Sequence, residues 1–144
     1  MENVSKHEEA VAWEVHAWAL HHFFYEKDEQ RWKDNLELVF NEHWETREQL
    51  EHDLQTRGAV HGDCDAFAMM CWFALQEAGV KSRLVMCLVE TGEGHLVCMT
   101  ENGLVLDNRQ SRVASNMDLQ KHGYRFLIMS GFEPGGKWHL VDLG

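Results

Sequence analysis

A long apolar helix is predicted over residues 66–78, because the run Ala-Phe-Ala-Met-Met-Cys-Trp-Phe-Ala-Leu is apolar on nearly every helical face. A helix that is apolar all round is buried, so this stretch must lie at the centre of the domain. Gly79 is a typical C-terminal stop for it. Cys64 lies just before the run, at the predicted first turn, where the helix N-terminus favours a thiolate over a thiol. The sequence therefore predicts a nucleophilic thiol at the mouth of a pocket.

Helical patterns precede this central helix and strand patterns follow it. Helices are predicted over residues 5–24, 28–40 and 46–57. The first begins with a capping box at Ser5, and its apolar stripe is expected to contain Ala10, Trp13, Ala17, Leu20 and Phe24.

Strands are predicted over residues 82–90, 95–100, 104–107, 124–130 and 137–143. Turns rich in glycine, residues 91–94 and 101–103, separate the first three of these strands. Helices followed by a meandering antiparallel sheet give an α+β fold, with the central helix packed on the sheet.

Length and charge limit the function classes. The 144 residues suit one domain with a single core. The net charge of −11 disfavours nucleic acid and anionic lipid as partners. No apolar run is long enough to span a membrane. The acidic N-terminus lacks the features of a signal peptide, so a cytoplasmic location is expected, or a periplasmic one if a leader was trimmed.

The four cysteines are expected to be reduced thiols, because no secretory context accompanies them. None of them forms a C-x-x-C pair, which argues against structural zinc. Cys71, Cys87 and Cys98 are interpreted as small core residues. Cys64 differs from these three by its flanking glycine and carboxylates.

A nucleophilic thiol needs a base, and the base needs a group that orients it. Of the ten histidines, His95 opens an apolar strand, and Asp107 ends another strand twelve residues later. A two-residue turn between these strands would place the two side chains on opposite faces of the sheet. A three-residue loop, with Gly103 left-handed, would set Asp107 opposite Val97 and within reach of His95. We therefore predict a three-residue loop or a bulge in this hairpin.

Three motifs carry a resemblance to a known family. They are Gly-Asp-Cys-Asp-Ala-Phe-Ala around Cys64, Gly-Glu-Gly-His-Leu-Val around His95, and Val-Leu-Asp-Asn-Arg around Asp107. Together they resemble the bacterial transglutaminase-like cysteine proteinases, the group that includes LapG-type proteases. The likeness extends over about residues 41–140 and includes Trp44, Tyr124 and Trp138.

The resemblance implies a papain-like or transglutaminase-like fold with Cys64 as nucleophile, His95 as general base and Asp107 as the orienting group. Residues 1–144 are then one peptidase domain, in which 1–40 form a helical extension and 41–144 the catalytic core. The oxyanion donors would be the Cys64 main-chain N–H and an upstream side chain, for which Trp44 is the candidate.

The resemblance also implies a calcium site, because acidic residues flank the family's cysteine as Asp63 and Asp65 flank Cys64. Carboxylates suit this hard cation. The alternative is that Asp63 caps the helix and Asp65 complements its dipole.

Three functions remain open on the sequence. The first is a thiol hydrolase that cleaves a peptide or isopeptide bond in a protein or peptide substrate through an acyl-enzyme on Cys64. The second is acyl transfer, as in a glutamine deamidase or transglutaminase. The third is a binding module without catalysis, against which the complete set of Cys64, His95 and Asp107 argues.

Overall fold

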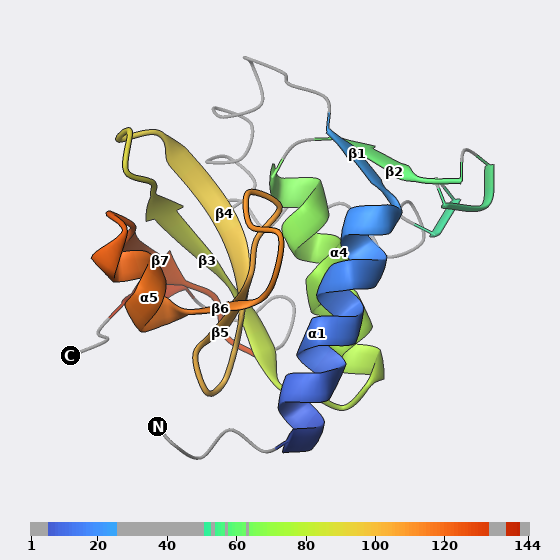
Figure 1. Ribbon diagram of the computed structural model, residues 1–144, viewed down its shortest axis with the longest axis horizontal. Coiled ribbons are helices and arrows are strands. Elements are labelled where there is room, and N and C mark those ends of the chain that lie inside the picture. Colours follow the sequence, from blue (N-terminus) through green and yellow to red (C-terminus); the bar gives the residue numbers. More distant parts are fainter. Residues whose placement is uncertain are drawn as a thin grey trace.

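The computed structural model describes residues 6–25, 51–52, 54–56, 58–62, 64–132 and 138–141 (Figure 1). The predicted helix over residues 28–40 lies outside the described residues, as do Trp44 and Asp63. Residues 51–52 and 54–56 are helical, in the range predicted for the third helix. The main-chain N–H of Gly58 donates to the Leu54 carbonyl at 3.1 Å, so this helix closes near the predicted end.

The central helix is α4, Cys64–Glu77. Every residue from 65 to 72 is buried, as expected of a helix that is apolar all round. Its C-terminus closes on Gly79, which has a φ of 79°, and the N–H of Val80 reaches back to the Leu75 carbonyl at 2.9 Å. This pattern is a Schellman-type cap, and a left-handed residue there favours glycine.

One sheet of six strands contains the predicted strands of the C-terminal half, in the order β6-β5-β4-β3-β7-β8 among the described residues. The strands are β3 (Ser82–Leu88), β4 (Gly94–Thr100), β5 (Leu104–Leu106), β6 (Ala114–Ser115), β7 (Arg125–Met129) and β8 (His139–Leu140). All neighbours are antiparallel. The sheet is not the simple meander that was predicted, because β7 returns to pair with β3, and β8 then forms the edge opposite β6. The α+β class is confirmed.

Helices cover both faces of this sheet (Figure 1). Helix α4 packs on the sheet face that carries Leu84, Leu96 and Leu106, and these residues share one hydrophobic cluster with the helix. The helix α5, Asn116–Lys121, covers the other face through Leu119, which packs with Val97. Neither α5 nor β6 was predicted, because elements of six and two residues are too short to show a period.

The first helix, α1, spans Lys6–His21 and lies beside α4 on the outer side (Figure 1). Its predicted stripe is only partly correct: Leu20 packs against the core, but Ala10 and Ala17 are exposed and Trp13 is 43% exposed. The buried residues of the helix are instead Ala12, His16 and Ala19. Alanines at the contact let two helix backbones approach closely, which the two tryptophans of α1 could not do.

Helix α1 also ends earlier than predicted. The chain enters the strand β1, Phe23–Tyr25, which pairs in parallel with β2, Val60–Gly62. The strand β2 leads directly toward α4. Among the described residues, no helix has the length and apolar character needed to cross a membrane.

Candidate active site

Cys64 is the first residue of α4, as the sequence predicted, and its side chain is partly buried against the central cluster. The strand β2 ends two residues before it and is held by β1 through the pairing of Tyr25 with Gly62. The thiol therefore lies at a helix N-terminus, and the pairing of β2 with β1 positions the chain that leads into this helix. The helix dipole at this end favours negative charge on the sulfur.

The hairpin between β4 and β5 has the predicted three-residue loop. Cys98 pairs with Leu106 and Met99 with Val105, which leaves residues 101–103 as the loop. Gly103 is left-handed, with a φ of 91°, and its N–H donates to the Thr100 carbonyl at 3.0 Å. The same register places the next residue, Asp107, on the face of His95.

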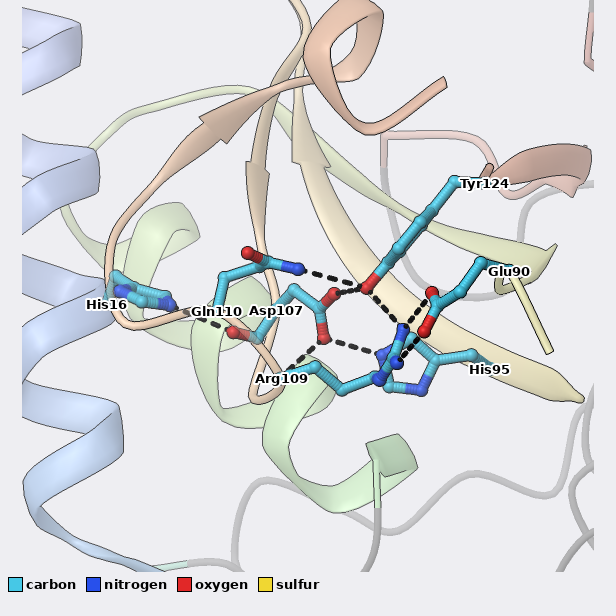
Figure 2. Close-up of polar contacts among 7 residues, drawn as sticks. All are labelled: His16, Glu90, His95, Asp107, Arg109, Gln110 and Tyr124. Carbon is cyan, nitrogen blue, oxygen red and sulfur yellow. Dashed lines mark hydrogen bonds and ion pairs between the residues drawn. The ribbon is translucent and has the colours of Figure 1, made fainter. Parts of the chain in front are cut away.

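His95 and Asp107 meet directly, with His95 Nε2 at 2.5 Å from Asp107 Oδ1 (Figure 2). His95 is 5% exposed and Asp107 is fully buried. Because Nε2 faces the carboxylate, Nδ1 is the ring nitrogen left to interact with Cys64, which lies near enough to contribute to the raised pKa of His95. The three predicted residues are thus brought together from α4, β4 and the end of β5.

The environment of His95 favours its charged form. Burial alone would lower the pKa of this imidazole, but the hydrogen bonds to Asp107 and Cys64 outweigh it and raise the pKa to about 9. Burial likewise acts to raise the pKa of Asp107, and the bonds from His95, Tyr124 and the Arg109 N–H reverse this effect, so its pKa is lowered. At neutral pH the pair is an imidazolium and a carboxylate.

A second group of side chains fixes the other oxygen of Asp107. The Tyr124 hydroxyl donates to Asp107 Oδ2 at 2.6 Å and accepts from Arg109 Nη1 at 2.9 Å and Gln110 Nε2 at 3.2 Å (Figure 2). Arg109 forms a two-pronged ion pair with Glu90, at 3.0 and 2.6 Å. Burial and the bond to Asp107 raise the pKa of Tyr124, so the phenol stays a donor. Both carboxylate oxygens of Asp107 therefore have fixed donors.

No sequence pattern pointed directly to these supporting roles. Tyr124 and Arg109 appeared only as parts of the family motifs, and Glu90 and Gln110 had no expected role. Their contacts span 14 to 19 residues and depend on the pairing of β7 with β3. Because β7 joins the far edge of the meander, local patterns could not place Tyr124 beside Asp107.

The other three cysteines are fully buried and free, which confirms their interpretation as core residues. Burial raises the pKa of Cys98 to about 12 and raises those of Cys71 and Cys87 as well. These thiols are therefore poor nucleophiles near neutral pH. Cys64 is the partly accessible one of the four.

The predicted calcium ligands are only partly described. Asp65 lies in the first turn of α4 and is 2% exposed. Asp63, the second predicted ligand, lies outside the described residues, as does the oxyanion candidate Trp44. Within the described part of the chain, no three histidine, cysteine or acidic residues group together as metal ligands. Calcium takes six to eight oxygen ligands. The acidic side chains of the described residues alone therefore do not make up a calcium ligand set.

Comparison with known proteins agrees with this geometry. A sequence model of the family described as bacterial transglutaminase-like cysteine proteinase (BTLCP) matches residues 26–143. None of the curated protein sequences is significantly similar to the chain.

The fold is shared with LapG from Legionella pneumophila. Its EGTA-treated form superposes with a TM-score of 0.67 at 20% identity, over 92% of this chain and 67% of that chain. Its calcium-bound form gives a TM-score of 0.66 at 18% identity, over 92% of this chain and 68% of that one.

Proposed function

The chain belongs to the bacterial transglutaminase-like cysteine proteinases, and on this premise we propose that it hydrolyses a peptide or isopeptide bond through an acyl-enzyme on Cys64. Membership of the family makes it a transglutaminase-like cysteine protease with a protein or peptide as substrate. The proposal assigns Cys64 as nucleophile, His95 as acid and base, and Asp107 as the group that orients His95. The proposal places these three residues in one peptidase domain, residues 1–144.

The chemistry follows from the two nitrogens of His95. Nε2 is held by Asp107, so Nδ1 holds the proton that Cys64 gives up, and the proposed resting pair is a thiolate beside an imidazolium. The thiolate attacks the substrate carbonyl carbon, and the Cys64 main-chain N–H, at the start of α4, stabilises the oxyanion. His95 then gives its proton to the leaving amine as the C–N bond breaks.

The resulting thioester is resolved by water. His95, now neutral, takes a proton from the attacking water molecule, and the sulfur of Cys64 leaves as the carboxylic acid is released. Asp107 stays ionised throughout and stabilises the imidazolium each time it forms. No step in this sequence requires a metal ion.

The observation that carries the proposal is the buried contact of 2.5 Å between His95 Nε2 and Asp107 Oδ1. A buried pair of charged groups costs free energy of desolvation, and removal of either partner leaves an uncompensated charge. A pair of this kind beside a partly accessible thiol at a helix N-terminus is the arrangement that activates a cysteine.

The test is alkylation of the native protein with iodoacetamide, followed by peptide mapping. Rapid labelling of Cys64 that is lost in His95→Ala, with Cys71, Cys87 and Cys98 unlabelled, supports the proposal. Equal labelling of all four cysteines only after denaturation would instead support a binding module that has kept the fold without catalysis.

Acyl transfer is the second candidate, because the same thioester can be resolved by an amine or formed from a glutamine side chain. What favours it is the transglutaminase-like character of the family. Release of ammonia from a glutamine-containing protein without cleavage of its chain would identify a deamidase. Cleavage of the chain without ammonia would identify the hydrolase.

Calcium binding by Asp63 and Asp65 is a separate proposal. Support comes from the calcium-bound form of LapG and from the buried carboxylate of Asp65 at the start of α4. A complete ligand set would need oxygens beyond the acidic side chains of the described residues. A thermal melt with added calcium, compared with one in chelator, tests it: a Tm that rises with calcium in the wild type and not in Asp65→Asn supports the site, and identical melts contradict it.

A further inference from the structure

Helix α1 precedes the region matched by the family model, yet one of its side chains reaches the site. His16 is 2% exposed, and its Nε2 lies 3.0 Å from the main-chain oxygen of Asp107, 91 residues away in the chain (Figure 2). Because a carbonyl oxygen only accepts, Nε2 of His16 carries the hydrogen. The same carbonyl also accepts from the Gln110 N–H at 3.1 Å, which closes the turn after β5.

His16 also contacts the helix that carries the nucleophile. Its ring meets that of Phe67 edge to face, with centroids 5.9 Å apart and planes at 84°. Phe67 is 1% exposed and lies three residues after Cys64, on the first turn of α4. The side chain of His16 thus contacts both the helix that carries Cys64 and the main chain of Asp107.

The chemistry of His16 suits a fixed donor. Burial lowers the pKa of His16 more than the hydrogen bond to Asp107 raises it, so the ring is neutral at neutral pH. A neutral ring with hydrogen on Nε2 gives one directed bond and adds no charge beside the imidazolium of His95. Its neighbours on α1, Ala12 and Ala19, are fully buried and let the helix come close.

We propose that His16 is a positioning residue of this active site, which fixes the main chain of Asp107 so that its carboxylate accepts from His95 Nε2. In this role, helix α1 supplies a residue that supports the active site. The inference rests on the proposed function, because it requires His95 to act on Cys64. It concerns placement of Asp107 and assigns no contact between His16 and substrate.

The test compares the pH dependence of Cys64 alkylation by iodoacetamide in the wild type and four variants. His16→Phe keeps the ring and removes the donor. His16→Gln returns an N–H near the position of Nε2, and His16→Asn is too short to do so. His21→Phe, on the exposed surface of the same helix, is the matched control.

We expect His16→Phe and His16→Asn to lower the rate of Cys64 alkylation at pH 6 by about fivefold, the equivalent of one ordinary hydrogen bond. The rise of the rate with pH should move to higher pH in both variants, because a poorly aligned Asp107 stabilises the imidazolium less. His16→Gln should recover most of the wild-type profile, and His21→Phe should match it.

A structural role alone would lower Tm and leave the pH profile of the folded protein unchanged. The proposal is overturned if His16→Phe and His16→Asn keep the wild-type profile, or if His16→Gln is as impaired as His16→Asn. If His16→Phe does not fold, the pair of amide variants decides. Failure of the wild type to show rapid Cys64 alkylation would refute the proposed function, a result distinct from the failure of this inference.

Discussion

The ion pair of His95 and Asp107 should make the stability of the protein depend on pH in a defined window. The pKa of His95 is about 9 in the folded protein, against 6.5 without the surrounding structure. At about 1.4 kcal/mol per pH unit, this difference corresponds to about 3 kcal/mol of stabilisation. His95 is 5% exposed, so solvent screens the pair little.

The sign follows from the raised pKa. The folded state holds the proton more tightly than the unfolded state, so the stabilisation is fully present below about pH 6.5. It is lost as the pH rises through about 9. The free energy of unfolding should therefore fall by about 3 kcal/mol between pH 6 and pH 10 from this group alone.

Urea denaturation of the reduced protein at several pH values measures this change. In Asp107→Asn the imidazole loses its buried carboxylate partner, and most of the fall attributable to His95 should disappear. His95→Gln, which removes the titrating ring, is the second variant and should also lack it. An equally steep fall in the wild type and in both variants would refute the reasoning, since the pH dependence would then come from other groups.

Two further substitutions test the surroundings of Asp107. Tyr124→Phe removes the hydroxyl that lies 2.6 Å from Asp107 Oδ2. Urea denaturation at neutral pH should show that the free energy of unfolding falls by about 1.5–3 kcal/mol, as for other hydrogen bonds to charged groups. A fall below about 0.5 kcal/mol, the size of an ordinary surface substitution, would contradict this. Gly123→Ala should cost more stability than the matched Gly79→Ala. Both glycines are left-handed, but a Cβ at Gly123 would lie 2.8 Å from Glu90 Cβ and 3.2 Å from Glu90 Cα, whereas a Cβ at Gly79 would meet no atom within 4 Å. Equal losses in the two alanine variants would show that crowding against Glu90 has no effect.

Local patterns in the sequence were enough to predict the central helix and the hairpin. A helix as apolar as α4 must be buried. The three-residue loop that ends at Gly103 follows from the requirement that His95 and Asp107 lie on the same face of the sheet. Both predictions agree with the structure. They needed only contacts close in sequence and the alternation of side chains along a strand.

The remaining features depend on contacts that are distant in sequence. The burial of α1 could not be predicted from its large residues, because Ala12 and Ala19 allow the close approach to α4 and Trp13 faces outward. For the same reason no local pattern could predict the role of His16, since its partner is a main-chain oxygen 91 residues away in the chain. The pattern of residue types along a sequence does not indicate which side chain will donate a hydrogen bond to a distant main-chain oxygen.

The central claim is that Cys64 forms a thioester with the help of His95. It is tested most directly by mixing the protein with p-nitrophenyl acetate, quenching in acid and mapping the acetylated residue. We predict a rapid burst of p-nitrophenol with the acetyl group on Cys64 in the wild type, slow loss of that group in water, and no burst in His95→Ala. An acetyl group that appears on Cys64 equally fast in His95→Ala, or mainly on other residues in the wild type, would contradict the account.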